Sequence, residues 1–179
     1  MTWAVMLCVL LGAALLQSGL PGWIWLGGAK WPFLLAATLY YAFTRRPATM
    51  LVAAIVGGVL QDALSPLPFG YSAFCLAGVG LLAAAFRPLV LGESVTTQAV
   101  FGAVAGAASA MAWYVLLAGR GAVEWPFARA LWRVAADGLL GAAATPLTFG
   151  AARALDRMVG NVTDEEREAE SWYGRRGPA

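Results

Sequence analysis

Residues 57–70 read Gly57-Gly58-Val59-Leu60-Gln61-Asp62-Ala63-Leu64-Ser65-Pro66-Leu67-Pro68-Phe69-Gly70. A single carboxylate, Asp62, stands at the end of a run that is otherwise apolar. A carboxylate is costly to place in lipid, so a protein contact, an ion or water must offset that cost. Glycines before Asp62 and a proline–glycine turn after it predict a helix end that packs tightly against neighbouring helices.

The composition around this stretch is that of an integral membrane protein. The chain has 179 residues, 60% of them hydrophobic and 12% charged, with a mean hydropathy of +0.69. Soluble domains carry about 25% charged residues. Histidine is absent, which excludes histidine-based acid–base catalysis and most zinc sites. Cys8 and Cys75 lie in separate apolar runs and are predicted to be packing residues, so no metal or cofactor site is expected.

Six apolar segments predict an all-α integral membrane bundle over residues 1–160, followed by a charged cytoplasmic tail over residues 161–179. The segments are Thr2–Gln17, Trp31–Thr44, Ala48–Leu64, Gly70–Phe86, Ser94–Leu117 and Phe127–Leu155. Boundaries from sequence carry an error of about three residues. These spans leave no room for a soluble catalytic domain.

The distribution of Lys and Arg predicts the orientation, because cytoplasmic loops are enriched in these residues. With both termini cytoplasmic, eight of the twelve basic residues fall inside and four outside. The inner set is Arg45, Arg46, Arg87, Arg153, Arg157, Arg167, Arg175 and Arg176; the outer set is Lys30, Arg120, Arg129 and Arg133. The short Arg45-Arg46-Pro47 loop decides the assignment, which predicts a multi-pass membrane protein with both termini in the cytoplasm.

The last apolar segment contributes three charges, Arg129, Arg133 and Asp137, spaced four residues apart along one helix face. Asp62 follows Pro47 by about 22 Å of helix, which puts it in the outer half of the membrane with these charges. One hypothesis is that Asp62 pairs with Arg133 or Arg129 and closes an outer polar cluster with Asp137. The alternative is that Asp62 caps a helix end.

Small residues form a ridge in the fifth segment, where Gly102 and Gly106 are followed by Ala110. Such ridges let helix backbones approach closely in a membrane. The ridge is therefore a candidate face either for packing inside the bundle or for docking a partner helix. No nucleotide-binding loop, serine nucleophile elbow or nucleic-acid-binding face is present in the sequence, and no catalytic residue is predicted.

These features resemble the rod shape-determining protein MreD family. The specific part is the stretch Gly58-Val59-Leu60-Gln61-Asp62, then Leu64-Ser65, Pro68 and Gly70, followed by an apolar helix that ends at the basic Arg87. The resemblance implies that Gly58, Asp62, Pro68 and Gly70 are structural motif positions. It also implies a fold similar to the substrate-binding components of energy-coupling-factor transporters.

The same resemblance implies a protein of the bacterial inner membrane and a function without enzymatic activity. Members of that family act as membrane scaffolds of the bacterial elongation complex and help maintain cell shape and lateral peptidoglycan synthesis. The implied partners are the bitopic MreC and, through it, MreB, RodA and a class B penicillin-binding protein, together with membrane lipid. The alternative from the implied fold is a vitamin-binding transporter component. Little polar chemistry is available in this sequence to recognise a vitamin.

Overall fold

Six helices make up the computed structural model, which describes residues 2–23, 28–65, 69–87, 94–119, 121 and 127–160. They are α1 (Thr2–Gly19), α2 (Phe33–Thr44), α3 (Pro47–Ala63), α4 (Tyr71–Phe86), α5 (Val95–Ala118) and α6 (Phe127–Met158). Each matches one predicted segment to within about three residues at both ends, and the all-helical prediction is confirmed for the described residues. The predicted tail, residues 161–179, lies outside them.

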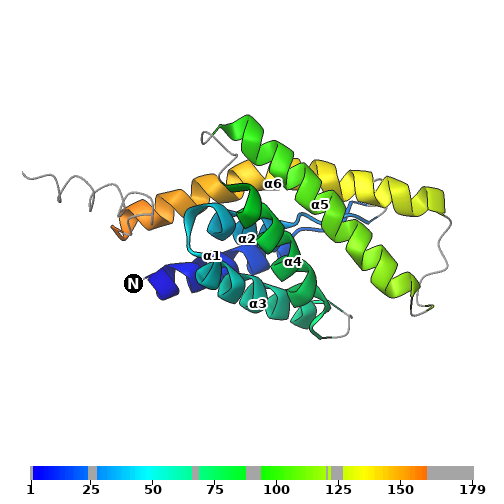
Figure 1. The fold of residues 1–179 in the computed structure, drawn as a ribbon, viewed down its shortest axis with the longest axis horizontal. Coiled ribbons are helices and arrows are strands. Elements are labelled where there is room, and N and C mark those ends of the chain that lie inside the picture. The colour runs from blue at the N-terminus through cyan, green and yellow to red at the C-terminus, as the bar shows by residue number, and fades with distance from the viewer. Residues whose placement is uncertain are drawn as a thin grey trace, which may run out of the picture.

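Helix α2 forms the centre of the molecule, with α1, α3, α4 and α6 packed around it (Figure 1). All of its residues except Phe33 and Phe43 are buried. Its polar Thr38 and Thr44 satisfy their hydroxyls within the helix by donating to the carbonyls of Leu34 and Tyr40. A short helix that is apolar on every face is stable only when other helices cover it completely.

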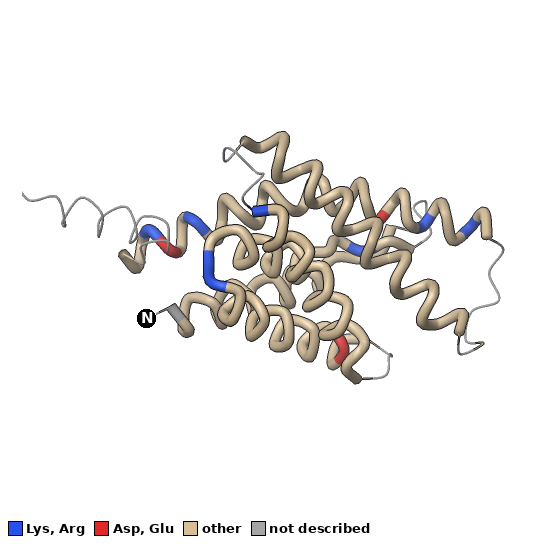
Figure 2. Tube along the Cα trace, in the orientation of Figure 1, with Lys and Arg blue, Asp and Glu red and all other residues tan. Residues whose placement is uncertain are grey.

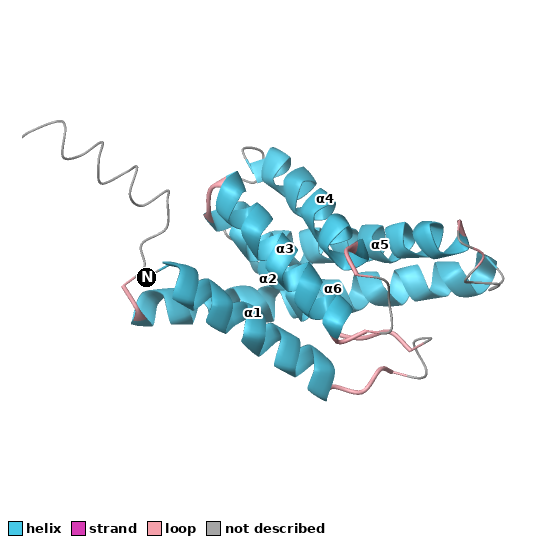
Figure 3. Ribbon diagram, turned by 90° about the horizontal axis from the view of Figure 1, so that it is seen from below, coloured by secondary structure: helices cyan, strands magenta, loops and turns pink. Residues whose placement is uncertain are grey.

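Helices α5 and α6 form a long antiparallel hairpin that contributes the most extensive helix–helix packing in the described structure. They are the two longest helices, with 24 and 32 residues. The hairpin projects along the long axis beyond the ends of α1, α3 and α4 in both ribbon views (Figures 1 and 3). The molecule therefore consists of a shorter four-helix block and a longer hairpin packed beside it.

The exposed surface of the helices is rich in large apolar side chains. Leu7 and Leu11 on α1, Phe74 and Leu82 on α4, and Val104 on α5 are all exposed. Basic residues are few along the trace and are separated by long stretches of uncharged chain (Figure 2). Among the described residues, only α5 is both long and apolar enough, by length and composition, to cross a membrane; α1–α4 are shorter apolar helices.

Candidate functional site

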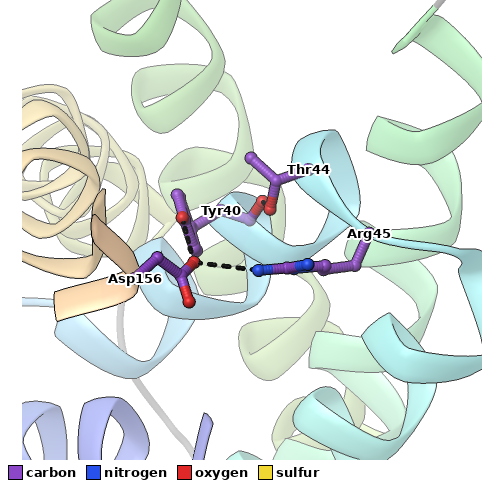
Figure 4. Close-up of polar contacts among 4 residues, drawn as sticks. All are labelled: Tyr40, Thr44, Arg45 and Asp156. Atoms are coloured by element: carbon purple, nitrogen blue, oxygen red, sulfur yellow. Dashed lines mark hydrogen bonds and ion pairs between the residues drawn. The ribbon is translucent and has the colours of Figure 1, made fainter. Parts of the chain in front are cut away.

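A deeply buried polar cluster joins the C-terminal ends of α2 and α6 through three side chains. The Tyr40 hydroxyl donates a hydrogen bond of 2.5 Å to Oδ2 of Asp156, and Nη2 of Arg45 lies 3.2 Å from the same oxygen (Figure 4). The Arg45 and Asp156 side chains are only 2% and 6% exposed. Two opposite charges are therefore held together almost entirely out of solvent.

Local sequence chemistry explains why Arg45 turns into the bundle. Helix α2 ends with the backbone N–H of Arg45 donating to the Tyr41 carbonyl. Pro47 occupies the first turn of α3, and the residue before a proline favours an extended backbone, as Arg46 shows with φ −61° and ψ 151°. The tight connection leaves Arg45 at the end of α2, where its side chain reaches Asp156 of α6.

The residue that follows α4 also contacts this cluster. Nη1 of Arg87, which follows the last residue of α4, donates to the Arg45 carbonyl at 3.3 Å. Within the cluster, the Tyr40 ring also packs edge-on against Phe149 of α6, at a centroid distance of 5.3 Å. The cluster thus fixes the relative positions of α2, α4 and α6 at one end of the molecule.

Sequence reasoning missed this cluster because it treated Arg45 only as a topological marker and did not consider Asp156. One signal was present. The predicted orientation places Arg45 and Asp156 at the same end of the bundle, and a lone acid among Arg153 and Arg157 is a natural partner for an arginine at that end. A carboxylate and a guanidinium that are buried together hold their two helices in place. Separating them would leave a buried charge without a counter-charge.

Asp62 caps a helix, and the hypothesis that it pairs with Arg133 or Arg129 is wrong. Its carboxylate accepts hydrogen bonds from the backbone N–H groups of Gly70, at 2.7 Å, and Ser72, at 3.2 Å. These amides begin α4, where N–H groups have no helical partner. The capping alternative therefore holds, and Asp62 is 1% exposed because it fills the turn between α3 and α4.

Arg133 forms an ion pair with a carboxylate of its own helix, Asp137. Its Nε lies 3.1 Å from Oδ2 of Asp137, one turn further along α6. Arg129 is exposed. The predicted outer cluster therefore reduces to the Arg133–Asp137 pair, because the ion pair that would join Asp62 to this cluster does not form.

Gly58 brings α3 and α4 into close contact. A Cβ atom at this position would overlap the backbone of Ala73 on α4, so only glycine allows the observed approach. Gly70 adopts a positive φ of +98° immediately before α4, a conformation that side chains with a Cβ rarely take. Three of the four motif positions, Gly58, Asp62 and Gly70, thus shape the α3–α4 hairpin, and Pro68 lies outside the described residues.

The Gly102–Gly106 ridge packs inside the molecule, so its alternative as a docking face for a partner is wrong. A Cβ atom on Gly106 would lie 2.5 Å from the carbonyl oxygen of Asp137, and one on Gly102 would overlap the Gly141 carbonyl. Both glycines are buried against α6, and Ala110 is half-buried. Substitutions on this ridge are expected to disturb the α5–α6 hairpin before any association with a partner.

Comparison with known proteins finds no matching family model, no matching curated protein and no matching solved structure. The function of the chain is therefore inferred from the contacts of its described residues. Their three carboxylates, Asp62, Asp137 and Asp156, are held respectively by two backbone amides, by one arginine, and by an arginine and a tyrosine. Each contact fixes a helix end or joins two turns or helices.

Proposed function

We propose that this chain is a non-enzymatic, multi-pass scaffold of the bacterial elongation complex, similar to MreD. The observation that carries the proposal is the stretch around Asp62, which resembles the MreD family in sequence and acts here as a rigid joint between α3 and α4. A joint built from a buried cap and a close glycine contact favours a fixed shape. A scaffold needs such a shape to present constant surfaces to its partners.

Placement in the inner membrane is supported by the surface and by the spacing of charges on α6. Arg133 and Arg153 are separated by about 30 Å of helix at about 1.5 Å per residue, which matches the thickness of the hydrocarbon core. The exposed Trp132 lies beside Arg133, and tryptophan is favoured at the interface. Exposed apolar side chains on α1, α4, α5 and α6 fit contact with lipid.

A structural role, as opposed to turnover, is supported by how the carboxylates are used. A general acid or base must reach a substrate, but Asp62 and Asp156 are buried in contacts that hold helices together. Asp137 is the third described carboxylate, and it is paired with Arg133. The polar chemistry of the described residues therefore serves the architecture of the bundle.

The proposed partners are the bitopic MreC and, through it, MreB, RodA and a class B penicillin-binding protein. Because the Gly102–Gly106 ridge is covered by α6, a partner helix must dock on one of the apolar surfaces that face lipid. Both termini are proposed to be cytoplasmic, which leaves the charged tail on the cytoskeletal side of the membrane.

Affinity purification from native membranes tests the proposal. The tagged full-length chain is extracted in mild detergent, and its companions are identified by mass spectrometry and quantified against an unrelated multi-pass protein with the same tag. We expect specific recovery of an MreC-type bitopic protein, and loss of rod shape when the chain is depleted. Recovery of a transporter energising module, or of a tightly bound vitamin, would instead identify the chain as a transporter component.

A further inference from the structure

The segment that precedes α2 is fixed against the first half of α6. Its backbone pairs with itself, since the N–H of Trp23 donates to the Ala29 carbonyl and the N–H of Gly28 donates to the Trp23 carbonyl, both at 3.0 Å. Ala29 is fully buried and packs in one cluster with Ala136 and Leu140 of α6. The backbone on either side of Ala29 therefore has a defined position on the surface of α6.

Two further basic residues flank the Arg133–Asp137 ion pair at this contact. Nη1 of Arg133 lies 3.7 Å from the point that a Cβ atom on Gly28 would occupy, so its guanidinium lies beside the segment. Lys30 is two residues further along the segment, and Arg129 is one turn away from Arg133 on the same face of α6. Three cations and one carboxylate therefore lie where the segment meets the helix, which leaves a local charge of +2.

Lys30 and Arg129 are exposed, and neither has a carboxylate partner among the described residues. Every described carboxylate is held by other groups, and the one in this region, Asp137, pairs with Arg133. The aliphatic part of Lys30 lies over Gly22, with its Cγ 3.6 Å from the point that a Cβ atom there would occupy. The two remaining positive charges are therefore accessible to an anion that the described residues do not supply.

We propose that Lys30 and Arg129 bind the phosphate of an anionic phospholipid at this end of α6. The inference rests on the membrane placement proposed above and adds a lipid class to it. Lys and Arg donate charge-assisted hydrogen bonds to phosphate oxygens, and a headgroup without its own ammonium group matches the surplus of positive charge. The exposed Trp23 and Trp132 belong to the same segment and the same turn of α6, and tryptophan is favoured at the level of the headgroups.

Native mass spectrometry of the full-length chain tests the proposal. The purified chain is reconstituted in nanodiscs that contain equal amounts of phosphatidylglycerol and phosphatidylcholine, and the lipids that stay bound on release are counted. We expect the parent to retain phosphatidylglycerol over phosphatidylcholine by roughly fivefold or more, which is the contribution of one cation near an anionic surface. Lys30→Gln and Arg129→Gln should each lower this preference, whereas Lys30→Arg should keep it because the charge remains. Since both residues are exposed, the unfolding temperatures of these variants should match that of the parent.

The matched control is Arg157→Gln, which removes an exposed arginine from the opposite end of α6 and should keep the preference. Equal retention of the two lipids by the parent would overturn the site, and so would a preference that survives substitution of Lys30 and Arg129. A preference that Arg157→Gln lowers equally would reflect overall charge and would also overturn it.

Two further measurements separate the source of the phosphate and the membrane placement from the site itself. Excess inorganic phosphate should leave the lipid preference of the parent unchanged, and loss of the preference would show that the site takes free phosphate in place of a headgroup. The chain should float with vesicles of the same two lipids in a density gradient. Failure to float would remove the membrane placement on which the inference rests, whereas flotation without a lipid preference would remove the inference alone.

Discussion

Two adjacent tyrosines in α2 test how much the buried cluster contributes at the scale of one hydroxyl. Tyr40 donates to Asp156, whereas the buried hydroxyl of Tyr41 has no hydrogen-bond partner among the described residues. We expect Tyr40→Phe to lower the free energy of unfolding by about 1.5–3 kcal/mol, because it removes a hydrogen bond to a charged group. Tyr41→Phe should change it by less than about 0.5 kcal/mol, or stabilise the protein. Denaturation of both variants in detergent measures the difference, and equal losses would contradict the assignment.

The Arg45–Asp156 pair predicts a large loss that a second substitution recovers. Asp156→Ala leaves the Arg45 guanidinium buried without its carboxylate and should cost about 3–5 kcal/mol. Replacing both residues together, as Arg45→Met with Asp156→Leu, should recover most of that loss, because no buried charge remains. The exposed neighbour Arg157→Ala is the control and should lie within about 0.5 kcal/mol of the parent. If the double variant were as unstable as Asp156→Ala, the loss could not be attributed to an unpaired buried charge.

At Asp62 the prediction separates helix capping from the ion pair that the sequence suggested. Asp62→Ala should cost about 1–3 kcal/mol, because the amides of Gly70 and Ser72 lose their acceptor in a buried turn. If Asp62 does not interact with Arg133, its cost should be the same in a background that carries Arg133→Gln. A double-mutant cycle on unfolding free energies should therefore close to within about 0.5 kcal/mol. A coupling energy above about 1 kcal/mol would restore the ion-pair hypothesis.

At the scale of helix pairs, Gly58 makes the α3–α4 contact sensitive to a single methyl group. Gly58→Ala should separate the two helices, because the new Cβ would overlap the Ala73 backbone, and the cost should reach about 2–4 kcal/mol. Gly78→Ala, in α4, is the matched control, since nothing lies within 4 Å of its added Cβ. Alanine's higher helix propensity makes that change neutral or stabilising by up to about 1 kcal/mol. Equal thermal stability of the two variants would show that the helices move apart without cost.

The helices themselves were predictable from the sequence, whereas their partners were not. Apolar runs bounded by Arg45-Arg46-Pro47 and by the Pro–Gly turn before α4 fix where helices start and end, so the boundaries agree closely. The pairing of polar groups depends on how the helices pack against one another. Helix lengths alone do not determine that pairing. Asp62 and Arg133 were placed at a similar depth, yet each finds a nearer partner along the chain. Arg45 and Asp156, which are 111 residues apart, meet because α6 packs along α2.

For the whole molecule, the remaining question is which end faces the cytoplasm. The arginine-rich end at Arg45 is predicted to be inside, with Lys30 and Arg129 at the outer end. Single cysteines replace the exposed residues Arg46, Arg157, Lys30 and Arg129 in a background without Cys8 and Cys75. A membrane-impermeant maleimide should label positions 30 and 129 in intact spheroplasts. Positions 46 and 157 should react only after the membrane is opened, because the proposed topology puts their end of the bundle in the cytoplasm. The reverse pattern would invert the topology and move the charged tail to the outer side, away from any cytoskeletal partner.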